Sequence, residues 1–174
     1  MKYSLNFFIF LIFFFFSNLS YSNTNIAYIN MEKIMNQSNA GILITKTLGD
    51  THKKNIESFK NIEAELKNEE TEILTQKNIL DKEDYENKIK KLRDKVKNYR
   101  VNRKKTLDSL NEKRIAATSE LLKSINPILT EYADMNSISI IMQKKNIIIG
   151  KKELDITNDI LAIVNEKIKN INID

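Results

Sequence analysis

The side chains that most often carry out chemistry are scarce in this chain. His52 is the only histidine, there is no cysteine, and three glycines are too few for a phosphate-binding loop of the Gly-x-x-x-x-Gly-Lys-Ser/Thr type. Carboxylates such as Glu69, Glu70 and Glu72 lie in a pattern typical of an open helix, where no second element would desolvate them. We therefore expect no catalytic residue, no metal site and no cofactor, and we do not expect an enzyme.

A basic segment is the stronger chemical signal. Residues 86–105 hold ten cations against two acids, whereas residues 53–72 hold four lysines against six glutamates. Pairing between these segments would neutralise only part of the positive excess, and the remainder predicts an anionic partner. Acidic protein segments, lipid headgroups and lipopolysaccharide are the alternatives for that partner. The cations assigned to it are Lys88, Lys90, Lys91, Arg93, Lys95, Lys97, Arg100 and Arg103.

These cations lie in a long segment with helical periodicity. From Leu48 to Leu80, seam positions recur at strict intervals of four and three residues, which is the heptad spacing of a coiled coil. The spacing resumes from Tyr85, and Asp81 between the two runs suits the N-cap of a second helix. We predict an antiparallel helical hairpin over residues 41–134. Its arm should project roughly 60 Å, because each helical residue adds about 1.5 Å.

The first 22 residues have the three parts of a secretory signal peptide. Lys2 supplies an early positive charge, residues 7–16 are all apolar, and a small-x-small cleavage site ends at Ser22. The alternative is an uncleaved membrane anchor, but the apolar run is shorter than the roughly 20 residues that span a bilayer. We therefore predict export. Nucleic acid would suit the basic charge, but it is not an expected partner of an exported protein.

The two ends of the remaining chain contain extended patterns. Residues 26–30 are an apolar run that predicts a strand, and residues 31–37 have the spacing of a short helix. Residues 138–142 and 146–149 predict two further strands joined as a hairpin. Thr157 begins a final amphipathic helix. The fold class is therefore α+β and mostly helical.

The strand-containing ends, residues 23–40 and 135–174, are assigned to one small α/β body. Pro127 should kink the returning helix or mark a change of its packing partner. A body with three short, open-edged strands buries little surface, so we expect an obligate homo-oligomer assembled through the strands. The residues assigned to that contact are Ile26, Tyr28, Ile138, Ile140, Met142, Ile147 and Ile149, with Ile138, Ile140 and Met142 expected on one face of their strand.

Both ends also carry motifs of a known family. Residues 26–35 with 38–41 resemble the opening of the Skp/OmpH family of periplasmic chaperones. Residues 154–161, followed by Asn165, resemble the closing motif of that family, and residues 80–85 are similar to its hairpin tip. The order of the predicted elements also matches. The arms differ from the usual family pattern because they are poor in Ala and Gln and rich in Asn, Ile and Lys.

The resemblance implies a jellyfish-shaped homotrimer in the periplasm. Strands of three subunits would build a central body, and three hairpins would enclose a cavity that holds unfolded outer-membrane proteins without ATP. The alternative is an exported structural coiled-coil scaffold tethered at a membrane. Most apolar residues of the hairpin are used by its seam, so few remain for a client. The residues predicted to contact clients lie off the seam and are Ile56, Leu74, Ile79, Val101 and Ile115.

Overall fold

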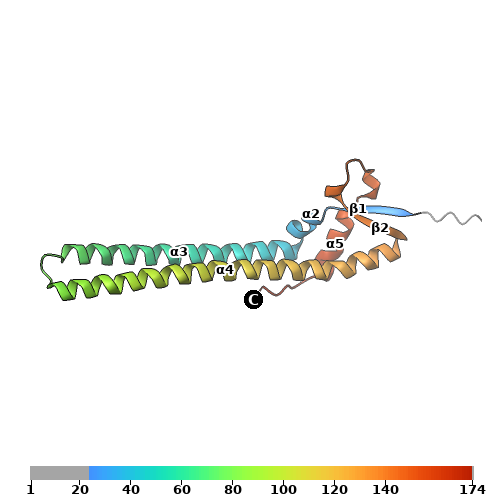
Figure 1. Ribbon diagram of the computed structural model, residues 1–174. Coiled ribbons are helices and arrows are strands. Elements are labelled where there is room, and N and C mark those ends of the chain that lie inside the picture. The colour runs from blue at the N-terminus through green and yellow to red at the C-terminus, as the bar shows by residue number, and fades with distance from the viewer. Residues whose placement is uncertain (1–23, 174) are drawn as a thin grey trace, which may run out of the picture.

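The structure is a computed structural model that describes residues 24–173, so the predicted signal peptide lies outside the described residues. The elements are β1 (Asn25–Ile29), α2 (Met31–Gln37), α3 (Asn39–Thr75), α4 (Lys82–Met135), β2 (Ile138–Gln143), two 3-10 turns, η1 (Lys144–Asn146) and η2 (Lys152–Leu154), and α5 (Thr157–Lys167). Figure 1 shows α3 and α4 side by side as a long hairpin, with the other elements gathered at one end. The predicted α+β, mostly helical fold is confirmed.

The tip of the hairpin forms where the sequence predicts it. Asp81 is the N-cap of α4, and its carboxylate accepts a hydrogen bond of 2.8 Å from the backbone N–H of Asp84. Helix α4 runs without interruption through Pro127. Beyond this residue the helix contacts α5, because Tyr132 donates a hydrogen bond of 3.0 Å to Asp159. The predicted kink or change of packing partner at Pro127 stays a prediction.

The sheet differs from the predicted arrangement. Strands β1 and β2 pair in parallel, with Ile26 opposite Ile140 and Tyr28 opposite Met142. A register shift between Asn25 and Ile26 leaves an extra residue in β2 and reverses the alternation of its side chains. The prediction that Ile138 shares a face with Ile140 and Met142 is therefore wrong, since Ile138 packs against the core.

The predicted third strand is also absent from the described chain. Asn146 ends the 3-10 turn η1 and residues 147–149 continue as a loop, so the expected hairpin with residues 138–142 does not form. Ile148 is 100% exposed and Ile149 is 90% exposed in the single chain, so neither is covered on two sides. An apolar triplet suits a buried strand only when the fold covers both of its faces, and Ile148 and Ile149 have no such cover in the single chain.

One apolar core joins the body to the root of the hairpin, the part of α3 and α4 nearest the body. Ile34 of α2, Leu121 and Ile125 of α4, and Ile160 and Val164 of α5 are fully buried in it. The first turns of α3 add further buried residues to the same cluster. The arm is therefore anchored by packing, which suits a chain without cysteine.

Hydrogen bonds between the two ends of the chain complete this anchor. The backbone N–H of Asn30 donates to the hydroxyl of Thr157 at 2.8 Å, and the N–H of Asn39 donates to the side-chain oxygen of Asn165 at 2.8 Å. Gly41 is required at the α2–α3 corner, because a Cβ atom there would lie 1.8 Å from the carbonyl oxygen of Met35. The opening and closing motifs are thus in direct contact.

Candidate functional site

The outer face of the sheet is the first candidate surface. The paired residues Ile26 and Ile140 lie on this face, as do Tyr28 and Met142, opposite the side that packs on the core. Ile26, Ile140 and Met142 are 40–49% exposed in the single chain, which is unusual for adjacent apolar residues of a strand pair. The structure therefore gathers four of the residues assigned to the oligomer contact on one side of a two-stranded sheet.

Tyr28 is the exception on this face, because the loop after β2 covers it. Its hydroxyl donates to the carbonyl of Lys151 at 3.1 Å, and the ammonium of Lys144 lies 5.6 Å from the centre of its ring. Gly150 allows the loop to approach, since a Cβ atom there would lie 2.9 Å from the ring. The loop that carries the exposed pair Ile148 and Ile149 is therefore held against the sheet.

Asp155 fixes the other end of this loop. Its carboxylate accepts hydrogen bonds from Lys144 at 2.8 Å and from the backbone N–H and hydroxyl of Thr157. Partial burial raises the pKa of Asp155, but these hydrogen bonds outweigh it and lower the pKa below its usual value. The hydrogen bond also raises the pKa of Lys144. The ionised carboxylate of Asp155 thus connects the loop to the start of α5. Thr157 extends this connection to the residue after β1, because its hydroxyl accepts a hydrogen bond from the backbone N–H of Asn30.

The arm carries a second candidate surface, because the cations of α4 divide into two sets. One set pairs across the hairpin: Lys88 donates to the amide oxygen of Gln76 at 2.7 Å, and Lys95 contacts Glu69 at 2.7 Å. Arg103 contacts Glu63 at 3.0 Å. Three of the eight cations assigned to an anionic partner therefore contact side chains of α3 or its C-cap Gln76.

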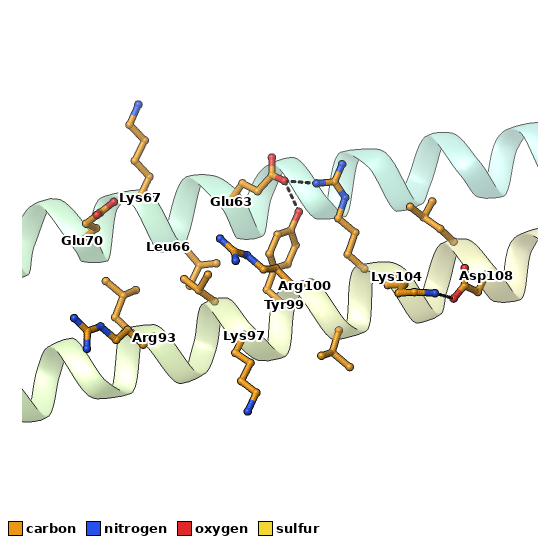
Figure 2. Close-up of a pocket in the computed structure, with 15 residues that line it drawn as sticks. Glu63, Leu66, Lys67, Glu70, Arg93, Lys97, Tyr99, Arg100, Lys104 and Asp108 are labelled. Atoms are coloured by element: carbon orange, nitrogen blue, oxygen red, sulfur yellow. Dashed lines mark hydrogen bonds and ion pairs between the residues drawn. The ribbon is translucent and has the colours of Figure 1, made fainter.

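The other five make no ion pair within the part of the chain that the structure describes; they are Lys90, Lys91, Arg93, Lys97 and Arg100. The positions of Lys90, Arg93, Lys97 and Arg100 are separated by three, four and three residues, so they lie on one side of α4. Figure 2 shows Lys97 directed away from α3. We call Lys90, Arg93, Lys97 and Arg100 the basic stripe.

An open cleft between the two helices lies beside the basic stripe. Its volume is about 1180 Å³, and its apolar lining residues are Leu66, Leu92, Val96, Val101 and Leu107. At its centre Glu63 reaches from α3 to the hydroxyl of Tyr99 and to Arg103 (Figure 2). Desolvation and the bond to Glu63 raise the pKa of Tyr99, which keeps this hydroxyl a hydrogen-bond donor.

Phe59 packs against the residues at the centre of the cleft. Its ring meets Tyr99 edge to face, with 6.2 Å between the ring centres, and Arg103 lies 5.5 Å from the centre of the Phe59 ring. This aromatic and ionic cluster links the two helices, and the cleft extends from it toward the tip at Leu92 and toward the body at Leu107. The arrangement offers apolar contact beside positive charge, without a deep enclosed pocket.

The predicted client-contacting residues lie apart from one another. Leu74, Ile79, Val101 and Ile115 are more than half exposed, whereas Ile56 is half-buried. They form no single groove. Other exposed apolar side chains near the root were missed, namely Ile42, Leu43, Leu122 and Met135. The criterion used for the predicted set, an apolar residue beside the seam, would also have selected residues such as Leu43 and Leu122, because the buried residues Ile44 and Leu121 lie next to them in the sequence.

The described residues contain neither a metal-binding cluster nor a membrane-spanning helix. Within residues 24–173, no three His, Cys, Asp or Glu side chains are close enough together to hold a metal ion. No helix in that same range is both long enough and apolar enough to cross a membrane.

Comparison with known proteins identifies the fold. A family model described as outer membrane protein (OmpH-like) matches residues 25–164. Among solved structures, the chain is similar to one from Caulobacter crescentus described as a candidate outer membrane chaperone (OmpH-like). The TM-score is 0.81 at 14% identity, over 85% of this chain and 88% of the other. No curated protein matches the sequence significantly.

Proposed function

The chain belongs to the OmpH-like family, and we propose on that basis that it is an ATP-independent holdase chaperone of the periplasm. Its clients are unfolded outer-membrane proteins, which it keeps soluble until they are assembled. The observation that carries the proposal is the construction of the arm. A buried root anchors two long helices whose distal part presents dispersed apolar residues and unpaired cations. Such a surface suits many weak contacts with an unfolded chain better than one tight site.

We further propose that the chain works as a homotrimer assembled through the outer face of the sheet. Supporting this, Ile26, Ile140 and Met142 are partly exposed in the single chain, and the nearby loop exposes Ile148 and Ile149. Adjacent apolar side chains on a sheet with open edges are expected to be covered by a second copy. Three copies would place three arms around one client.

The test of assembly is Ile140→Asp. Because Ile140 is 49% exposed in the single chain, a carboxylate there is tolerated by the monomer but is desolvated without a partner in the oligomer. Light scattering should show folded monomers in place of trimers. The matched control is Leu74→Asp on the exposed side of the arm, which should remain trimeric. A trimeric Ile140→Asp variant would refute this placement of the contact.

The test of function is capture of a denatured β-barrel protein diluted from urea. Stoichiometric amounts of the chaperone should suppress its precipitation, and long-range attraction to the basic stripe should make capture slower as salt rises. A variant with Lys90, Arg93, Lys97 and Arg100 changed to Gln should capture more slowly and lose the salt dependence. The control changes four exposed lysines of α3 to Gln and removes the same charge; they are Lys46, Lys53, Lys54 and Lys60.

The second function is an exported coiled-coil scaffold tethered at a membrane. Its support is the long hairpin, which would serve a spacer equally well. Failure to suppress precipitation at any ratio favours the scaffold. If capture is independent of salt for both the native protein and the basic-stripe variant, electrostatic attraction does not contribute to capture and the apolar contacts account for it. Anionic lipid and lipopolysaccharide remain the other partners proposed for the basic stripe, and vesicle binding by the same two variants tests them.

A further inference from the structure

The segment after α5 lies against the root of the hairpin although it forms neither a helix nor a strand. Residues 168–173 have no regular structure, yet Ile168 and Ile171 are buried and Ile173 is half-buried against the shared core. Figure 1 shows this segment leaving α5 and running along α4 toward the arm. We call residues 168–173 the tail. The hairpin root therefore already accommodates an irregular chain through its isoleucines.

The surface against which the tail packs has two parts. Near α5 the tail lies beside Pro127 and Ile128 of α4. Further along, Ile173 lines one side of an open cavity of about 480 Å³ between α3 and α4. Leu48 and Leu110 form the apolar end of this cavity, which is separate from the cleft beside the basic stripe.

Polar groups of the same cavity complete this surface. Thr51 and Asn55 of α3 and Thr106 and Ser109 of α4 line the cavity. The Thr51 hydroxyl donates to the carbonyl of Thr47 and can still accept, and the other three side chains are of types that both donate and accept hydrogen bonds. An irregular backbone needs such partners because its own N–H and C=O groups are not paired as in a helix or a sheet. The cavity thus combines apolar contact with hydrogen-bonding groups.

We call the surface that the tail covers, from Pro127 and Ile128 to the cavity at Leu48 and Leu110, the root groove. We propose that the root groove binds extended apolar segments of unfolded polypeptides, and that the tail occupies it until such a segment displaces the tail. The inference rests on the proposed chaperone function and names one site through which that function acts. The groove suits a client segment because an irregular, isoleucine-bearing segment already fits it. The tail is displaceable because the burial of a few isoleucines is largely offset by the ordering of a segment without regular structure.

Tethering makes the groove selective. A tail attached to α5 competes at a millimolar effective concentration, so short peptides that bind weakly are excluded. A long unfolded chain contacts other parts of the arm at the same time and can displace the tail. The groove therefore opens to clients that are already engaged elsewhere on the protein.

The experiment places a photocrosslinking amino acid at Ser109, in the groove, or at Ile115, which is exposed on the same helix and does not line the groove. Each is tested in the full chain, in a chain that ends at Lys169, and in a full chain with Ile171→Ser and Ile173→Ser. Circular dichroism first establishes that all three fold. The probe is a β-barrel outer-membrane protein diluted from urea.

We expect loss of the tail contacts to raise client crosslinking at Ser109 at least about threefold and to leave crosslinking at Ile115 unchanged. Equal yields at Ser109 with and without the tail would overturn the proposal. So would an equal rise at both positions, since that indicates general loosening.

A second measurement does not depend on clients. A fluorescent peptide with the sequence of residues 167–174 should bind the chain that ends at Lys169 and not the full chain, and a peptide with its isoleucines changed to serine should bind neither. Peptide binding to the shortened chain without client crosslinking at either position would reject the holdase function while leaving the groove intact. Absence of peptide binding to a folded shortened chain would reject the groove itself.

Discussion

The root of the hairpin and its distal part belong to the same two helices, yet they are held together differently. At the root, Leu121 and Ile125 are completely buried, and α5 and the sheet pack against the same side. In the distal part, only Phe59, Ile73 and Leu92 are buried, and ion pairs and polar hydrogen bonds also join the two helices there.

This difference sets the main source of stability, at the root, apart from the exposed surface of the distal helices. Burial at the root supplies the free energy that keeps the helices folded, because transfer of apolar surface from water is the main stabilising term. The distal helices leave apolar and charged side chains in solvent, where they are free to meet a partner. Local opening should therefore cost much less near the tip than at the root. Four predictions test this contrast.

The largest contrast should come from removing one leucine of α4 at each place. Leu121→Ala empties a fully buried position at the root and should lower the free energy of unfolding by roughly 2–5 kcal/mol. Leu92→Ala removes a distal seam residue and should mainly speed amide exchange near the tip, with a smaller effect on global unfolding. Denaturant titration and hydrogen exchange measure the two effects, and equal losses of global stability would contradict the division.

A second contrast uses the two glycines of α3. Gly41→Ala places a Cβ atom against the backbone of Met35 and should destabilise the protein by about 3 kcal/mol, at the upper end of the cost of overpacking. Gly49→Ala meets no atom within 4 Å and should be neutral or stabilising by up to about 1 kcal/mol through helix propensity. Thermal unfolding of both variants would show whether the α2–α3 corner is as tight as the contact implies.

The third prediction concerns acid sensitivity of the body. The folded pKa of Asp155 lies below its usual value of 3.8, so its ionised form stabilises the fold above about pH 4 and this contribution is lost as the pH falls through the folded pKa. Asp155→Asn should cost roughly 1 kcal/mol at pH 7, because it removes the charge from the hydrogen bonds to Lys144 and Thr157.

The difference between Asp155→Asn and the native protein should shrink as the pH falls below about 4. Urea titrations across this range measure it. A difference that stays constant with pH would mean that the side chain acts through its shape and not through its charge.

The smallest effect should come from the ion pairs of the arm. Glu69→Gln removes the charge opposite Lys95, and both side chains are partly exposed, so global stability should change by at most about 1 kcal/mol. Amide exchange should become faster in the distal part of the hairpin, and high salt should reduce the difference from the native protein. A loss comparable to that of Leu121→Ala would show that ionic contacts and not the root hold the arm.

Local patterns in the sequence determined the long elements. Heptad spacing from Leu48 and the cap at Asp81 were sufficient for the hairpin and its tip, and the spacing after Thr157 was sufficient for α5. Each of these signals lies within a few residues of the element it specifies, since helical periodicity and capping depend on near neighbours. The charge excess of α4 was visible for the same reason.

The division of that charge was decided by tertiary structure. The sequence did not distinguish Lys95, which pairs with Glu69 in the other helix, from Lys97, which points away from it. Register between two helices is set by all their contacts together. Whether a side chain of α4 points toward α3 or away from it follows from that register and not from its neighbours in the sequence.

The arrangement of the strands and of the tail depends even more on tertiary structure than the pairing of the α4 cations does. β1 and β2 are separated by more than a hundred residues, so neither their parallel pairing nor the bulge that turns Ile138 toward the core could be inferred from period-two alternation. Residues 146–149 had the composition of a strand, but they pair with neither β1 nor β2 and form the end of a 3-10 turn and a loop. The packing of the tail against α3 and α4 likewise depends on surfaces that exist only after the hairpin and α5 have packed together.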